Sequence, residues 1–130
     1  MANTVTLLED HKGMTTPRVH GDEYYVDCAV NITNYSGSTD GEGEIVTAAS
    51  LGLSRINAVL VTGQETKSYV PMVEIAAADG DYASRTQLVI KLLTHDASET
   101  GAGNSADVLM EAAHDLTDLG MIRLRVYGIL

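Results

Sequence analysis

The sequence has no tryptophan, no phenylalanine, two prolines and a single cysteine. Its large aromatic residues are six tyrosines, so the core must be built mainly from leucine, isoleucine, valine and methionine, which suits thin sheets packed face to face. A single cysteine excludes an intrachain disulfide. Because Cys28 lies in an alternating apolar segment, we expect it to be a small core residue and not a nucleophile.

Basic residues are also scarce, with 8 lysines and arginines against 18 acidic residues and a net charge of −10. Binding to a phosphate backbone needs concentrated positive charge, so we expect no nucleic-acid partner. The absence of a long apolar run, and of a basic and apolar leader, predicts no transmembrane helix, no secretory signal and no membrane partner. The length favours a single domain over residues 1–130, in which residues 1–21 can form an extended N-terminal segment.

Two segments alternate between apolar and polar residues with the period of a β-strand. In residues 24–33 the face expected to line the core carries Tyr24, Val26, Cys28, Val30 and Ile32, and the outer face carries Tyr25, Asp27, Ala29, Asn31 and Thr33. In residues 121–130 the core side carries Ile122, Leu124, Val126 and Leu130, and the outer side carries Arg123, Arg125 and Tyr127. Both segments therefore predict strands with one buried face.

Four more segments have the composition of strands. Residues 4–9 are the expected first strand. Residues 55–62 and 86–94 are apolar on both faces in part, which is typical of central strands or of strands covered on their outer side. Residues 68–75 contain Pro71, which cannot donate to a ladder and so places this strand at a sheet edge or a bulge. Polar, glycine-containing stretches at 34–43, 78–81 and 95–107 are expected loops.

Residues 106–120 admit two interpretations. An apolar stripe at helical spacing favours one helix over the whole segment. The alternative, which we favour, is a short strand followed by one helical turn over residues 114–120, because the rest of the chain predicts evenly spaced strands. With either choice the sequence predicts an all-β fold of five to eight strands: an antiparallel β-sandwich, jelly-roll-like, with one short helical turn or helix.

No arrangement of residues predicts a catalytic centre. The sequence lacks the nucleophile elbow of serine hydrolases and the glycine-rich, lysine-containing loop that binds phosphates. The histidines are spread along the chain without ligand partners at zinc-site spacing, so we expect surface or loop positions for His11, His20, His95 and His114. We therefore expect no enzyme, no catalytic residues and no cofactor.

Two groups of acidic residues lie among glycines, as calcium ligands often do. They are Asp40, Glu42 and Glu44, and Asp79 and Asp81. Neither group has the spacing of a twelve-residue calcium loop, so we expect solvated acidic loops and no metal site.

The segment GEIVTAASLGLSRINAVLV (residues 43–61) predicts a strand, a compact turn and a second strand. We expect Thr47 or Ser50 to satisfy amides at the start of the turn and Gly52 to allow a positive φ or close packing. Leu51 and Leu53 cannot both point outward at low cost, so the segment should form a buried corner of the fold.

The same segment resembles small virion structural proteins of tailed bacteriophages. The features shared are Gly43-Glu44, Thr47-Ala48, Leu51-Gly52-Leu53-Ser54 and Ile56. The order of elements over residues 21–128 is similar as well, whereas residues 63–68 and 95–107 depart from the pattern. The resemblance implies a virion protein, some members of which decorate or cement capsids. For this chain it implies binding to the outer surface of the major capsid protein, after assembly in the host cytoplasm.

Apolar residues on both faces of 55–62 and 86–94 also predict a symmetric homo-oligomer, because exposed apolar patches usually mark contacts. The residues expected to face outward are Val59, Val61, Val89 and Leu93. A homotrimer is implied only by the analogy with capsids, whose icosahedral shells offer three-fold sites.

Two other functions fit the expected fold. The first is a tail, neck or fibre-associated virion module. The second, a carbohydrate-binding β-sandwich, needs a platform of exposed aromatic side chains. The tyrosines are scattered along the sequence, at Tyr24, Tyr25, Tyr35, Tyr69, Tyr82 and Tyr127, which does not favour it.

Overall fold

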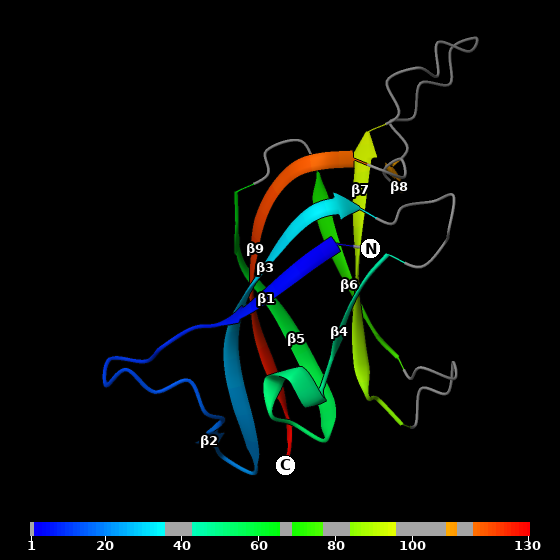
Figure 1. Cartoon of the computed structure of the whole chain (residues 1–130). Coiled ribbons are helices and arrows are strands. Elements are labelled where there is room, and N and C mark those ends of the chain that lie inside the picture. Colours follow the sequence, from blue (N-terminus) through cyan, green and yellow to red (C-terminus); the bar gives the residue numbers. More distant parts are fainter. Residues whose placement is uncertain (1, 36–42, 66–68, 77–83, 96–108, 112–115) are drawn as a thin grey trace, which may run out of the picture.

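The computed structural model describes residues 2–35, 43–65, 69–76, 84–95, 109–111 and 116–130. Within them the chain forms nine strands and one short 3-10 helix, and the strands make two antiparallel sheets that face each other (Figure 1). The five-stranded sheet has the order β1-β3-β9-β5, with β2 paired to β3; its strands are Ala2–Leu7 (β1), Arg18–His20 (β2), Glu23–Tyr35 (β3), Arg55–Gln64 (β5) and Leu116–Ile129 (β9). The four-stranded sheet has the order β4-β7-β6, with β8 paired to β7; its strands are Glu44–Thr47 (β4), Val70–Ala76 (β6), Gln87–His95 (β7) and Leu109–Glu111 (β8).

The chain passes repeatedly between the two sheets. It leaves the five-stranded sheet after β3, returns for β5, and returns again for β9, so the paired strands β3 and β9 enclose the paired strands β4 and β7 in the sequence. Such nesting is a feature of jelly rolls. The predicted antiparallel, jelly-roll-like sandwich is therefore confirmed. β1 and β2 both come from residues 1–21, so that segment contributes two strands to the five-stranded sheet.

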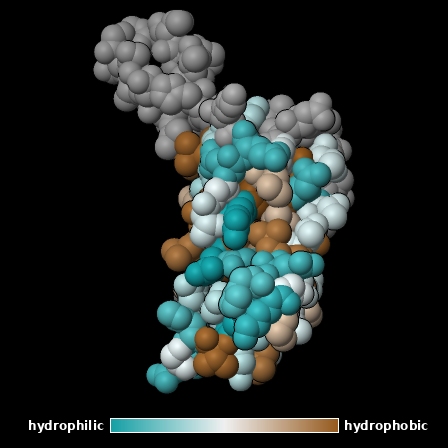
Figure 2. Space-filling model, turned by 90° about the vertical axis from the view of Figure 1, so that its left-hand side faces the viewer, coloured by the Kyte–Doolittle hydropathy of each residue, from teal (hydrophilic) through white to brown (hydrophobic). Residues whose placement is uncertain are grey.

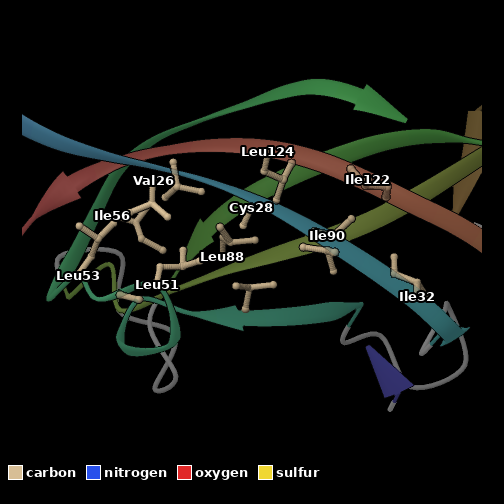
Figure 3. Packing of buried hydrophobic residues seen from close by; sticks show 14 of the residues in the cluster. Val26, Cys28, Ile32, Leu51, Leu53, Ile56, Leu88, Ile90, Ile122 and Leu124 are labelled. Atoms are coloured by element: carbon tan, nitrogen blue, oxygen red, sulfur yellow. The ribbon is translucent and has the colours of Figure 1, made fainter. Parts of the chain in front are cut away.

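The core lies between the two sheets (Figure 3). The fully buried side chains of β3, β9 and β7 alternate along each strand: Val26, Cys28, Val30 and Ile32; Ile122, Leu124 and Val126; Leu88, Ile90 and Leu92. The predicted inner faces of 24–33 and 121–130 are thus confirmed, apart from their ends. Tyr24 is only partly buried, and β3 continues to Tyr35, whose buried hydroxyl accepts a hydrogen bond from the Leu92 amide at 3.0 Å.

The prediction that Leu130 lines the core is wrong, because this residue follows β9 and is 62% exposed. Two positions earlier, the inward position of β9 is occupied by Gly128. A Cβ atom at Gly128 would lie 2.0 Å from the carbonyl oxygen of Arg55. The close approach of β5 therefore leaves no room for a side chain there, and the apolar alternation ends at Val126.

The predicted strands differ from the structure mainly in their place within a sheet. β7 is central, as expected, and β6 with Pro71 lies at an edge, as expected. Residues 55–62 match neither of the two expected positions, a central strand or a strand covered on its outer side. β5 is the last strand of its sheet, and its outward-facing Leu60 is 53% exposed. β1 at Ala2–Leu7 confirms the expected first strand, shifted by two residues.

Of the two interpretations of residues 106–120, the structure confirms only the short strand expected over residues 108–112, which is β8. Residues 109–111 form β8 and residues 116–120 belong to β9, so a helix over the whole segment is wrong, and so is a helical turn at 116–120. Leu116 and Thr117 pair with the far end of β3. This pairing overrides the local helical stripe, since tertiary contacts commonly outweigh intrinsic propensity. Residues 114 and 115, where the turn was also expected, lie outside the described residues.

The segment 43–61 forms the predicted buried corner: β4, the 3-10 helix Ala49–Leu51, then β5. The Thr47 hydroxyl accepts a hydrogen bond from the Ser50 amide at 3.3 Å, and Gly52 has a φ of 76°. Leu51 and Leu53 are 0% and 4% exposed and close one end of the core, as Figure 3 shows. Each contributes roughly 1.5–3 kcal/mol through burial.

Candidate binding surface

The outer face of the five-stranded sheet carries a group of ordered polar and aromatic side chains. Antiparallel pairing of β3 with β9 places Tyr25 opposite Tyr127 and Asp27 opposite Arg125. The short strand β2 adds Arg18 beside Tyr25. We call this group the arginine–tyrosine cluster: Arg18, His20, Tyr25, Asp27, Arg125 and Tyr127. Figure 2 shows this side of the molecule, where hydrophilic residues gather in the middle with hydrophobic ones beside them.

A two-pronged ion pair lies at the centre of the cluster. Arg125 donates from Nε to Oδ1 of Asp27 at 2.7 Å and from Nη2 to Oδ2 at 2.9 Å. Asp27 is only 7% exposed. The hydrogen bond from Arg125 is the main cause that lowers the pKa of Asp27 below its usual value, and the charges of Arg18 and Arg123 act in the same direction. The same hydrogen bond raises the pKa of Arg125, so both groups stay ionised at neutral pH.

Arg18 is held less tightly than Arg125. Its Nη2 lies 3.5 Å from Asp27 and its Nη1 lies 3.7 Å from Asp10. Its Nε and Nη2 atoms are covered, yet neither makes a hydrogen bond to the described part of the chain. Asp10 is fixed by its own loop, because the amides of Met14 and Lys12 donate to its carboxylate and lower its pKa.

The aromatic rings of the cluster pack against one another and against the two guanidinium groups. The guanidinium carbons of Arg18 and Arg125 lie 4.8 Å and 4.6 Å from the centre of the Tyr25 ring. The Tyr25 and Tyr127 ring centres are 6.1 Å apart, and His20 lies 6.1 Å from the first and 5.7 Å from the second. Cation–π contacts at partly exposed sites each contribute about 0.5–1 kcal/mol. The cluster is therefore ordered before any partner arrives.

This arrangement is suited to binding. The carboxylate of Asp27 is already paired with arginines. The neighbouring Cys28 faces the core, where burial raises the pKa of its thiol to about 12. Within the described residues there is no group of three potential metal ligands and no pocket. Arginine and tyrosine are, however, enriched among the residues that dominate protein–protein binding energy.

The structure places the predicted histidines and acidic residues as follows. His11 and His20 are exposed, and His20 joins the cluster. The prediction of a solvated loop position is wrong for Glu44, which lies in β4 and is completely buried, where it accepts a hydrogen bond from Asn3 of β1 at 2.8 Å. His95 is the last residue of β7. Asp40, Glu42, Asp79, Asp81 and His114 lie outside the described residues.

The four residues expected to form an oligomer contact do not share one exposed surface. Val59 is partly buried and packs against the core, and Val89 is 7% exposed, so the expectation is wrong for both. Leu93 is also partly buried, and Val61 is 39% exposed. The homotrimer itself stays a prediction.

The sequence did not reveal that two tyrosines meet. Tyr25 and Tyr127 are separated by most of the chain, so their positions in the sequence do not indicate a contact. Their outward orientation was visible in the alternation of 24–33 and 121–130, and an antiparallel pairing of those two strands would have brought them together.

No described helix has the length and apolar character needed to cross a bilayer. Comparisons with protein-family models, with curated proteins and with solved structures find no match to this chain.

Proposed function

We propose that this protein is a structural protein of a tailed-bacteriophage virion that binds the outer surface of the capsid and reinforces it. The resemblance of residues 43–61 to virion structural proteins supports a role in the virion. The residues that carry this resemblance form a buried corner and not a reactive site. The observation that carries the binding role is the arginine–tyrosine cluster, which is ordered and partly exposed on the outer face of a rigid sheet. A preordered contact surface loses little entropy on binding.

Reinforcement follows from mass action. A protein that binds the assembled shell, and not its separated subunits, shifts the equilibrium toward the shell. Repetition of the same contact over many identical sites of one particle adds the individual contributions.

The proposal predicts that capsids lacking this protein release their DNA at a lower temperature than complete capsids. Adding the purified chain back should restore the original release temperature, measured by the fluorescence of a DNA-binding dye during heating. An unchanged release temperature in both experiments would contradict capsid reinforcement. Labelled protein found only at the tail or neck would favour the tail, neck or fibre-associated module.

One observation favours the carbohydrate-binding sandwich as a second candidate, namely the contact between Tyr25 and Tyr127. A sugar ring packs on a free aromatic face, and the guanidinium groups of Arg18 and Arg125 already lie over Tyr25. Because the ring of Tyr25 is already covered, we rank the carbohydrate-binding function below the capsid role.

A further inference from the structure

One arginine on the outer face of the five-stranded sheet has a different environment from the cluster beside it. Arg123 lies in β9, two residues before Arg125, and is exposed. Its cross-strand neighbours are Ala29 on β3 and Gly63 on β5, the two smallest side-chain types. A Cβ atom at Gly63 would lie 3.8 Å from the Cβ of Arg123, which is ordinary van der Waals contact. Neither neighbour offers an acceptor to the guanidinium group.

Arg125 provides the contrast on the same strand. Its guanidinium group is fixed by two hydrogen bonds to Asp27. For Arg123, the described residues contribute no side-chain hydrogen bond and no ion pair within 4.0 Å; only its backbone carbonyl accepts one, from Thr62. The guanidinium of Arg123 is therefore available to a partner, whereas that of Arg125 is already occupied.

Arg123 is one of three arginines near the carboxylate of Asp27. Arg18, Arg123 and Arg125 all act on this carboxylate, and Arg18 also pairs with Asp10. Two residues before Arg123 on β9, the amide of Met121 donates to the carboxylate of Glu65, which follows β5. These charges balance locally, while the chain as a whole carries a net charge of −10. The available guanidinium group of Arg123 is complementary to a carboxylate on a partner.

An apolar residue lies next to the arginines of β9. Leu60 of β5 is opposite Arg125 in the sheet and is 53% exposed. Tyr127, on the same face, is partly exposed. Tyrosine and arginine are enriched among the residues that carry binding energy in protein interfaces, and the exposed Leu60 adds apolar area beside them.

We propose that Arg123, Leu60 and Tyr127 form the contact surface for an acidic protein partner, which presents a carboxylate to Arg123 and an apolar group to Leu60. In the proposed function, on which this inference rests, that partner is the exterior of the capsid. Nucleic acid is the other polyanion to consider. A phosphate backbone is a long array of negative charges and is repelled by the net charge of the whole chain, whereas an acidic patch on a protein needs only local complementarity.

The test compares matched variants of exposed residues on the two outer faces of the sandwich. Arg123→Gln and Lys91→Gln each remove one positive charge, and Lys91 lies on the four-stranded sheet, 3.6 Å from Glu74. Leu60→Ser and Val70→Ser each remove an apolar side chain that is about half exposed, at 53% and 51%. Binding of each variant to capsids purified without the chain is measured by cosedimentation, at low and at high salt. Thermal melts of the free variants confirm that they fold.

We expect Arg123→Gln and Leu60→Ser each to weaken binding by about tenfold, a typical loss for residues that dominate an interface. The Lys91→Gln and Val70→Ser variants should bind within about twofold of the unaltered chain, since surface substitutions outside a contact have small effects. Arg123→Gln should also reduce the weakening of binding by salt, because it removes a charge from the contact.

Each contrary outcome has a distinct meaning. If the unaltered chain does not bind capsids, the proposed function fails. If it binds, but the controls lose as much affinity as Arg123→Gln and Leu60→Ser, the capsid role stands and the assigned surface is wrong. If the chain instead retards free double-stranded DNA, and Arg123→Gln abolishes this, the partner is a nucleic acid and the inference of an acidic protein surface is overturned.

Discussion

The carboxylate of Asp27 accepts two hydrogen bonds from Arg125 and lies 3.5 Å from Arg18. Both guanidinium groups in turn lie over the ring of Tyr25. A single acidic side chain therefore holds two arginines, and through them a tyrosine, in fixed positions on the outer face. Without it, two partly covered positive charges would lie side by side with no counter-charge between them.

We predict that Asp27→Asn lowers the free energy of unfolding at neutral pH by about 1.5–3 kcal/mol, the range for hydrogen bonds to charged groups. The pKa of Asp27 is lower in the folded chain than its usual value of 3.8. Its contribution is therefore present above that value and is lost as the pH falls through the folded pKa. Urea titrations between neutral and strongly acidic pH measure the difference between the two proteins.

The matched control for this prediction is Asp22→Asn, at an exposed position in the turn between β2 and β3. It should change stability by less than about 0.5 kcal/mol. A difference between Asp27→Asn and the unaltered chain that stays constant from neutral to strongly acidic pH would show that the ionised carboxylate is not its source.

The sequence predicted the cluster only in part. Alternation showed that Tyr25, Asp27, Arg125 and Tyr127 point outward. It could not show which residue of β3 lies opposite which residue of β9, because these two strands lie near opposite ends of the sequence. Arg18 comes from a strand of three residues, too short for a periodic pattern.

At the scale of elements, the corner between β4 and β5 is the best-predicted feature. Its turn residues act locally: Thr47 through its hydroxyl, Gly52 through its left-handed backbone. Local chemistry of this kind is visible in a sequence. The edge position of β5 and the strand at 116–120 depend instead on β9, which pairs with both β3 and β5 and arrives last in the chain. Non-local pairing was therefore the main source of error.

We predict that Leu53→Asp prevents stable folding, whereas Leu60→Asp leaves the melting temperature nearly unchanged. Leu53 is 4% exposed and Leu60 is 53% exposed, so the same substitution buries a carboxylate in one case and leaves it in water in the other. Burial of an unpaired charge costs several kcal/mol, against a total stability of about 5–15 kcal/mol. Thermal melts followed by circular dichroism decide the matter. Similar melts for both variants would show that the corner is not part of the core.

At the scale of the whole molecule, the two outer faces of the sandwich differ. The five-stranded sheet presents the arginine–tyrosine cluster together with Arg123 and Leu60. The four-stranded sheet presents Val70 and Met72 and a partly exposed ion pair between Lys91 and Glu74. The available guanidinium group of Arg123 on the outer face of the five-stranded sheet favours an orientation of that face toward carboxylates of the shell. We therefore expect the five-stranded sheet to face the capsid.

Electron microscopy of purified virions, with and without this protein, tests whether it binds the capsid. We expect density on the outside of the shell that repeats with the icosahedral lattice, disappears from particles lacking the protein, and fits the sandwich with its five-stranded sheet toward the capsid. Density confined to the tail, neck or fibres, or no difference between the two particles, would contradict it.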